Sequence, residues 1–131
     1  MPVSLTETFN IKQLIETENI KVFYQPIISI KQKTIIGMEA LCRGFINSSS
    51  NLIPPDMMFA LAERENTLLE LDRFCRKKAI ETFTNLNLNK NDYLLFLNIN
   101  TAIIDKGVVG SGNLINNVND YGLNPNNVVI E

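Results

Sequence analysis

The chain has 131 residues, of which 45% are apolar, a formal net charge of −2 and no histidine. This composition suits one domain with a core, and the absence of a basic run argues against a DNA- or RNA-binding protein. Without histidine, Ser-His-Asp triads, Cys-His dyads and histidine-based metal sites are excluded. No apolar run is long enough for a membrane helix and no signal-peptide pattern opens the chain, so we expect a cytoplasmic protein with Cys42 and Cys75 free.

Apolar periodicity predicts strands and helices in alternation. Strands are expected at 21–30, 34–43, 93–100 and 127–131, and helices at 9–18, from residue 54, and at 68–86, 101–105 and 113–121. Because Pro26 cannot donate a ladder hydrogen bond, the first strand is expected at a sheet edge or beside a bulge. Strands separated by helices indicate an α/β fold with a mostly parallel sheet.

The longest predicted helix, 68–86, has one apolar face. Its apolar positions are Leu68, Leu71, Cys75, Ala79, Phe83 and Leu86. Arg73, Arg76, Lys77 and Lys78 form a basic run that is typical of a solvated helix face. Asp72, close to the start of the helix, is interpreted as an ordinary helix-terminus residue.

The predicted strand at 34–43 carries two charged residues among apolar ones. Strand side chains alternate between faces, so Glu39 and Arg43 share a side with Gly37 and Leu41, and lie roughly 13 Å apart. An unpaired buried charge is costly. The residues themselves leave two interpretations open, which are structural or solvent-facing charges at the strand end and a functional site.

Six short motifs follow one another along the chain. They are Tyr24-Gln25-Pro26-Ile27, Glu39-Ala40-Leu41-Cys42-Arg43, Ile53-Pro54-Pro55-Asp56, Leu71-Asp72-Arg73, Phe96-Leu97-Asn98-Ile99-Asn100 and Val128-Val129-Ile130-Glu131. Their order and spacing resemble those of the EAL-domain family of cyclic-di-GMP phosphodiesterases. The resemblance implies a TIM-barrel-like fold whose first strand is antiparallel to the others. It also implies that 1–131 is the N-terminal half of such a domain, with a helical lead-in at 1–19 and the first strands and helices of the barrel at 20–131.

The same resemblance implies a reaction and its residues. Glu39, Asn98 and Glu131 resemble the family's ligands for Mg²⁺ or Mn²⁺, and Glu39 is the expected catalytic residue. Arg43 resembles a phosphate contact and Gln25 a guanine contact. The implied reaction is the hydrolysis of cyclic-di-GMP to linear pGpG in bacterial second-messenger signalling. From the residues alone, Gln25 also suits a core amide and Asn98 a loop-capping residue.

Several family motifs lie beyond the last residue of this chain, including the paired aspartates, so we expect the chain alone to be inactive. The alternatives are a non-catalytic module that binds cyclic-di-GMP or another protein, and a half barrel without a ligand. A half barrel exposes a sheet edge and apolar surface. We therefore expect a homodimer or larger self-association, with strands 93–100 and 127–131 at its centre.

Overall fold

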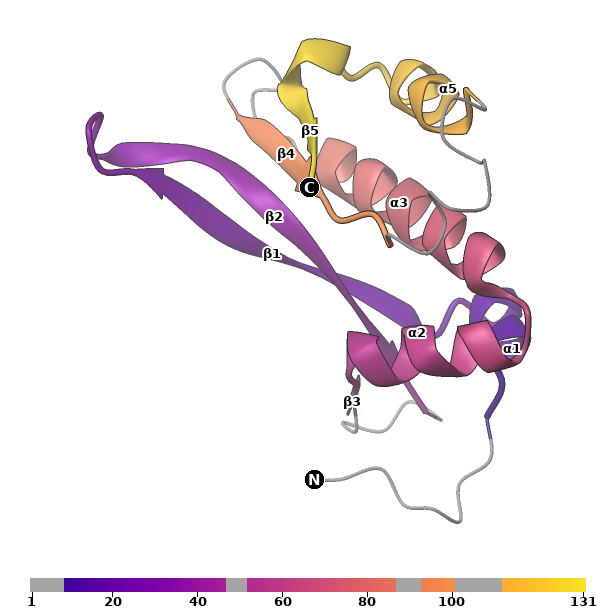
Figure 1. Cartoon of the computed structure of the whole chain (residues 1–131). Coiled ribbons are helices and arrows are strands. Elements are labelled where there is room, and N and C mark those ends of the chain that lie inside the picture. Colours follow the sequence, from indigo (N-terminus) through magenta and orange to yellow (C-terminus); the bar gives the residue numbers. More distant parts are fainter. Residues whose placement is uncertain (1–8, 47–51, 87–92, 101–111) are drawn as a thin grey trace.

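The computed structural model describes residues 9–46, 52–86, 93–100 and 112–131, and it shows a twisted sheet with its helices on one side (Figure 1). The elements are α1 (Ile11–Glu16), β1 (Ile20–Ser29), β2 (Thr34–Phe45), β3 (Leu52–Ile53), α2 (Pro55–Arg64), α3 (Leu68–Asn85), β4 (Leu94–Leu97), α5 (Asn113–Asp120), a 3-10 turn at Pro125–Asn127, and β5 (Val128–Ile130). The helix predicted at 101–105 lies outside the described residues. None of the described helices is both long and apolar enough to cross a bilayer.

Strands β1 and β2 form a long antiparallel hairpin, as predicted. The pairing runs from Ile20 opposite Gly44 to Ser29 opposite Thr34, with an irregularity after Ile27. β1 has β2 as its partner and lies at the edge of the described sheet, which is where Pro26 is tolerated. The hairpin end projects away from the helices (Figure 1).

Strand β2 is longer than the sequence predicts. It continues through Gly44 and Phe45, which pair with the short strand β3 at Ile53 and Leu52. The strand was predicted to end at residue 43, because glycine followed by serines is typical of loops. Pairing with β3 provides hydrogen-bond partners for the backbone of Gly44 and Phe45, and it thereby extends the strand.

The parallel part of the sheet runs β2–β4–β5, which confirms the predicted mostly parallel sheet. Gly37 of β2 lies opposite Leu94, and a Cβ atom at Gly37 would sit 2.5 Å from the Leu94 carbonyl oxygen. Glycine is therefore required for this close approach of the two strands. β4 and β5 are shorter than predicted, and the pairing of β2 with β4 ends at Glu39 and Phe96.

The helices bury two apolar clusters against one face of the sheet. The first joins α1, α2 and the start of α3 to the start of β1, the end of β2 and β3. Its buried members are Ile11, Leu14, Ile20, Ile46, Ile53, Met58, Ala62, Leu68, Leu71 and Cys75. The second joins α3 and α5 to the strands, and its buried members are Ala40, Ala79, Ile80, Phe83, Leu95, Leu97, Val118 and Leu123. Helix α1 belongs to the first cluster, so it packs as part of the core. The division at residue 19 stays a prediction.

The apolar face of α3 is confirmed, except that Leu86 lies past the helix end and is exposed. The solvated basic face is wrong for Arg76, which is only 7% exposed. Lys77 is exposed as expected, and Lys78 forms an ion pair with Glu18 over 3.8 Å. Arg76 is buried because Asp72, one turn earlier, is also buried and neutralises its charge.

Helix α5 ends as its sequence predicts. Gly122 adopts a left-handed backbone conformation, with φ of 71°, after Tyr121 caps the helix. The Leu123 N–H then donates to the Val118 carbonyl oxygen. This arrangement satisfies carbonyl groups of the last turn and directs the chain back toward β5.

Candidate functional site

The two faces of the sheet have different surroundings. One face packs on the helices: the Tyr24 hydroxyl donates to the Ala79 carbonyl oxygen at 2.6 Å, and Met38 and Leu95 belong to the second cluster. The opposite side, which we name the open face, is not covered by any described helix (Figure 1). Because strand side chains alternate, Gln25 and Glu39 belong to the open face.

Three predicted site residues come together on the open face. Glu39, Phe96 and Val129 lie side by side across β2, β4 and β5. Two residues further along, alternation places Asn98 and Glu131 on this same face. The Ile99 N–H donates to the Glu131 carbonyl oxygen at 3.1 Å, and the Glu131 N–H donates to that of Leu97 at 3.0 Å.

The carboxyl groups of Glu39 and Glu131 meet although their positions are 92 residues apart in sequence. A hydrogen bond with Glu39 raises the pKa of Glu131, and desolvation and the negative charge of Glu39 raise it further. Two carboxylates in contact repel each other unless a proton or a cation lies between them. The pair therefore favours a bound positive charge.

The donors at this position are oxygen atoms. They are the two carboxylates and the side-chain amide of Asn98, and such oxygens suit hard divalent cations. Among the described residues, no group of three or more histidine, cysteine, aspartate or glutamate side chains is placed to hold a metal ion. A role of these oxygens as metal ligands therefore stays a prediction.

The two predicted substrate contacts also lie on β1 and β2. Gln25 is exposed and lies directly opposite Glu39, while Arg43 is half-buried and donates from Nη1 to the Cys42 carbonyl oxygen at 2.9 Å. Lys21 lies opposite Arg43, and its ammonium group is 4.8 Å from the centre of the Phe45 ring. Lys21 was not among the site residues predicted from the sequence, although alternation along β1 places it on the face of Gln25.

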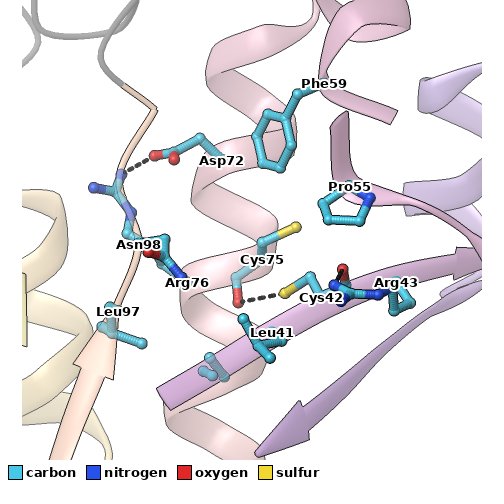
Figure 2. Close-up of a pocket in the computed structure, with 12 residues that line it drawn as sticks. Leu41, Cys42, Arg43, Pro55, Phe59, Asp72, Cys75, Arg76, Leu97 and Asn98 are labelled. Atoms are coloured by element: carbon cyan, nitrogen blue, oxygen red, sulfur yellow. Dashed lines mark hydrogen bonds and ion pairs between the residues drawn. The ribbon is translucent and has the colours of Figure 1, made fainter. Parts of the chain in front are cut away.

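A pocket of about 230 Å³ opens where β2 and β4 stop pairing (Figure 2). It is lined by residues from β2, α2, α3 and the end of β4, including Arg43, Phe59, Cys75 and Asn98. The thiols are free, and Cys42 donates from Sγ to the Cys75 carbonyl oxygen at 3.8 Å. The pocket therefore lies between the part of β2 that follows Glu39 and the end of β4, where Asn98 is the next residue.

A buried ion pair borders this pocket and was missed from the sequence. Asp72 is 2% exposed, and its Oδ2 lies 2.8 Å from Nη2 of Arg76 (Figure 2). Burial raises the pKa of Asp72, while the Arg76 charge acts in the opposite direction. The spacing of four residues is the available sequence signal, since such residues lie on the same side of a helix.

The chain was compared with known proteins. It is 31% identical over 93 residues to the protein named "Probable cyclic di-GMP phosphodiesterase PdeI" from Escherichia coli (strain K12). The matched region covers 69% of this chain and 12% of that protein. Its fold resembles that of the PaMucR phosphodiesterase in complex with c-di-GMP, with a TM-score of 0.77, 20% identity, and coverage of 91% of this chain and 48% of the other. It also resembles Klebsiella pneumoniae BlrP1 in a manganese and cyclic-di-GMP complex, with a TM-score of 0.67, 23% identity, and coverage of 86% and 26%.

These likenesses confirm the predicted TIM-barrel-like α/β fold with its antiparallel first strand. The chain spans about an eighth of the curated relative and about half of the first structure. The family model of the EAL domain matches residues 9–131, which is nearly the whole chain. The chain therefore belongs to the EAL domain family.

Proposed function

We propose that this chain contributes part of the active site of a metal-dependent cyclic-di-GMP phosphodiesterase. The observation that carries the proposal is the contact between the carboxyl groups of Glu39 and Glu131, with Asn98 directly after the neighbouring strand β4. The name of the Escherichia coli relative and the nucleotide complexes of the structural neighbours support the substrate. We further infer a cytoplasmic location in bacterial signalling, which agrees with two free thiols.

The residues present suit Mg²⁺ or Mn²⁺. Glu39, Asn98 and Glu131 would hold the ion through oxygen atoms, and a bound cation would relieve the repulsion between the two carboxylates. When bound, such an ion activates a water molecule and neutralises phosphate charge. The manganese complex of the BlrP1 neighbour supports this choice of metal.

The remaining residues of the open face are suited to a nucleotide. Arg43 and Lys21, opposite each other on β2 and β1, provide positive charge for a phosphate group. Gln25, opposite Glu39, offers an amide that both donates and accepts hydrogen bonds, as recognition of a guanine edge requires. The product of cleaving one phosphodiester bond would be linear pGpG.

The test uses a full-length EAL domain that includes these 131 residues, which we call the family-length domain, with Mg²⁺ or Mn²⁺ present. Glu39→Gln should reduce cyclic-di-GMP turnover by at least ~10²-fold, because even residues that only orient metal ligands are worth about 10–100-fold. Glu63→Gln, at an exposed glutamate of α2, is the matched control and should leave turnover unchanged. Equal turnover in both variants would refute the role of Glu39.

By itself, the chain is proposed to be catalytically silent, with nucleotide or protein binding as its remaining function. The observation in favour is that the described residues bring together two carboxylates and one amide, whereas hard cations take about six oxygen ligands. Calorimetry with cyclic-di-GMP, alongside an assay for pGpG, separates binding from cleavage. Cleavage by the purified 131-residue chain that persists in Glu39→Gln would contradict this assignment.

A further inference from the structure

Asn98 directly follows β4, and among the described strands its segment pairs with β5 but not with β2. Toward β5, the backbone around it is held by the two hydrogen bonds between Leu97, Ile99 and Glu131. Toward β2, ladder pairing ends at Glu39 and Phe96, and the pocket opens beyond them. The residues that follow β4 therefore need another anchor if Asn98 is to keep a fixed position.

Asp72 of α3 is placed to provide that anchor. Its Oδ1 accepts a hydrogen bond from the Asn100 N–H at 3.5 Å, and its Oδ2 pairs with Arg76 Nη2 at 2.8 Å. The carboxylate thus joins the helix beneath the sheet to the backbone two residues after Asn98. Asp72, Arg76 and Asn98 all line the same pocket (Figure 2).

Stability alone does not account for this buried pair. Replacing a buried ion pair by apolar residues of similar volume is often neutral or stabilising, because desolvation offsets the attraction between the charges. Moreover, the Nε atoms of Arg73 and Arg76 are buried and have no hydrogen-bond partner among the described residues. An apolar pair would fill the space, but it would not accept the Asn100 N–H. The carboxylate differs from an apolar side chain in that it accepts the hydrogen bond from the Asn100 N–H.

We propose that Asp72, held in place by Arg76, is a positioning residue that fixes the segment after β4 and thereby orients Asn98 on the open face. The role of Asn98 as a metal ligand rests on the proposed function, whereas the anchoring of the segment does not. Asp72 itself touches neither substrate nor metal in this scheme; it acts through Asn98.

Two double variants test the anchor without leaving a buried charge unpaired. Asp72→Asn with Arg76→Met keeps an acceptor oxygen for the Asn100 N–H, and Asp72→Leu with Arg76→Met removes it at similar volume. Amide hydrogen exchange is measured in the 131-residue chain by NMR. The leucine variant should exchange at least ~10-fold faster at Ile99 and Asn100, with α3 and the hairpin unchanged, while the asparagine variant should stay close to the unmodified chain.

Leu14→Ala is the control for general destabilisation, since Leu14 is buried in α1 far along the chain from this segment. It should raise exchange across the protected amides, without a selective increase at Ile99 and Asn100. Equal exchange at Ile99 and Asn100 in both double variants would overturn the anchor.

A second measurement connects the anchor to Asn98. In the family-length domain, Mn²⁺ affinity should fall about 10–100-fold in the leucine variant and stay near the original in the asparagine variant. If unmodified protein binds no Mn²⁺, the proposed function fails, and the exchange result still decides the anchor. If Mn²⁺ binds equally well to both variants, the orientation of Asn98 by Asp72 is refuted.

Discussion

The covered and open faces of the sheet place opposite demands on their side chains. On the covered face, Leu95 and Leu97 are almost completely buried against α3 and α5. On the open face, Phe23 is 46% exposed and Ile35 40% exposed. Packing therefore restricts one face, whereas the other is free to present charged and polar groups. Folding and the proposed chemistry depend on different faces of the same strands, so substitutions should separate them.

The largest expected difference in stability compares two large apolar residues. Leu71→Ala, in the core between α3 and its neighbours, should lower the free energy of unfolding by about 2–5 kcal/mol, because it leaves a cavity. Phe23→Ala, on the open face, should lower it by less than ~1 kcal/mol. Urea unfolding of both variants measures the difference. Similar losses would show that the open face is packed in solution.

The alternation of side chains allowed the open face to be predicted from the sequence. Period-two patterning placed Glu39 and Arg43 on one side of their strand, and the pairing of β1 with β2 sets Gln25 opposite Glu39. What alternation does not specify is the register between strands far apart in sequence. The contact of Glu39 with Glu131 depends on that register, and the structure was needed to show it.

A second variant tests the close approach of β2 and β4, which contribute to both faces of the sheet. Gly37→Ala places a methyl group against the Leu94 backbone, and it should lower the free energy of unfolding by about 1–3 kcal/mol. Thermal unfolding with Gly112→Ala as a comparison separates steric clash from backbone strain, since a Cβ at Gly112 would make only an ordinary contact but φ there is 82°. Unchanged stability in Gly37→Ala would mean that β4 shifts freely along β2.

The covered face should also determine how the protein responds to alkaline pH. Burial raises the pKa of Tyr24 far above the ordinary value of 10.0. Above pH 10 the unfolded chain loses this proton while the folded chain retains it, so stability is full below that pH and falls as pH rises. Tyr24→Phe should remove most of the fall, at a loss of about 1 kcal/mol at neutral pH for the hydrogen bond to Ala79.

Unfolding measured against pH, with tyrosinate absorbance as a second probe, checks this expectation. Tyr121→Phe is the comparison, because Tyr121 is less deeply placed and should have a smaller effect. An alkaline fall of the same size in the chain carrying Tyr24→Phe would assign it to other groups.

The smallest effect on folding, and the clearest on assembly, is expected at the sheet edge. Ile130 of β5 is 41% exposed at the edge of the described sheet. If chains associate through this edge, Ile130→Lys should weaken the association about 10-fold or more while changing stability by less than ~0.5 kcal/mol. Sedimentation at micromolar concentration measures it, with Met57→Lys on α2 as an exposed control. A monomeric original chain would refute the predicted homodimer.

The burial of Arg76 shows where sequence patterns stop being informative. Four basic residues within six positions of a helix resemble a solvated face, and periodicity assigns them by composition alone. Whether one of these side chains is buried depends on an oppositely charged partner one helical turn away and on room for the side chain between the helix and the sheet. Asp72 and the divergence of β2 from β4 provide both, and neither is visible in a hydrophobic pattern.

The order of strands in the sheet, β1-β2-β4-β5, is also their order along the chain. During synthesis, each strand that leaves the ribosome therefore finds its partner already made, at the growing edge of the sheet. The hairpin and α3 can begin to pack before β4 exists, and none of the described strands has to be inserted between two earlier ones. Vectorial folding of this kind avoids a search among alternative strand pairings while the chain is still being made.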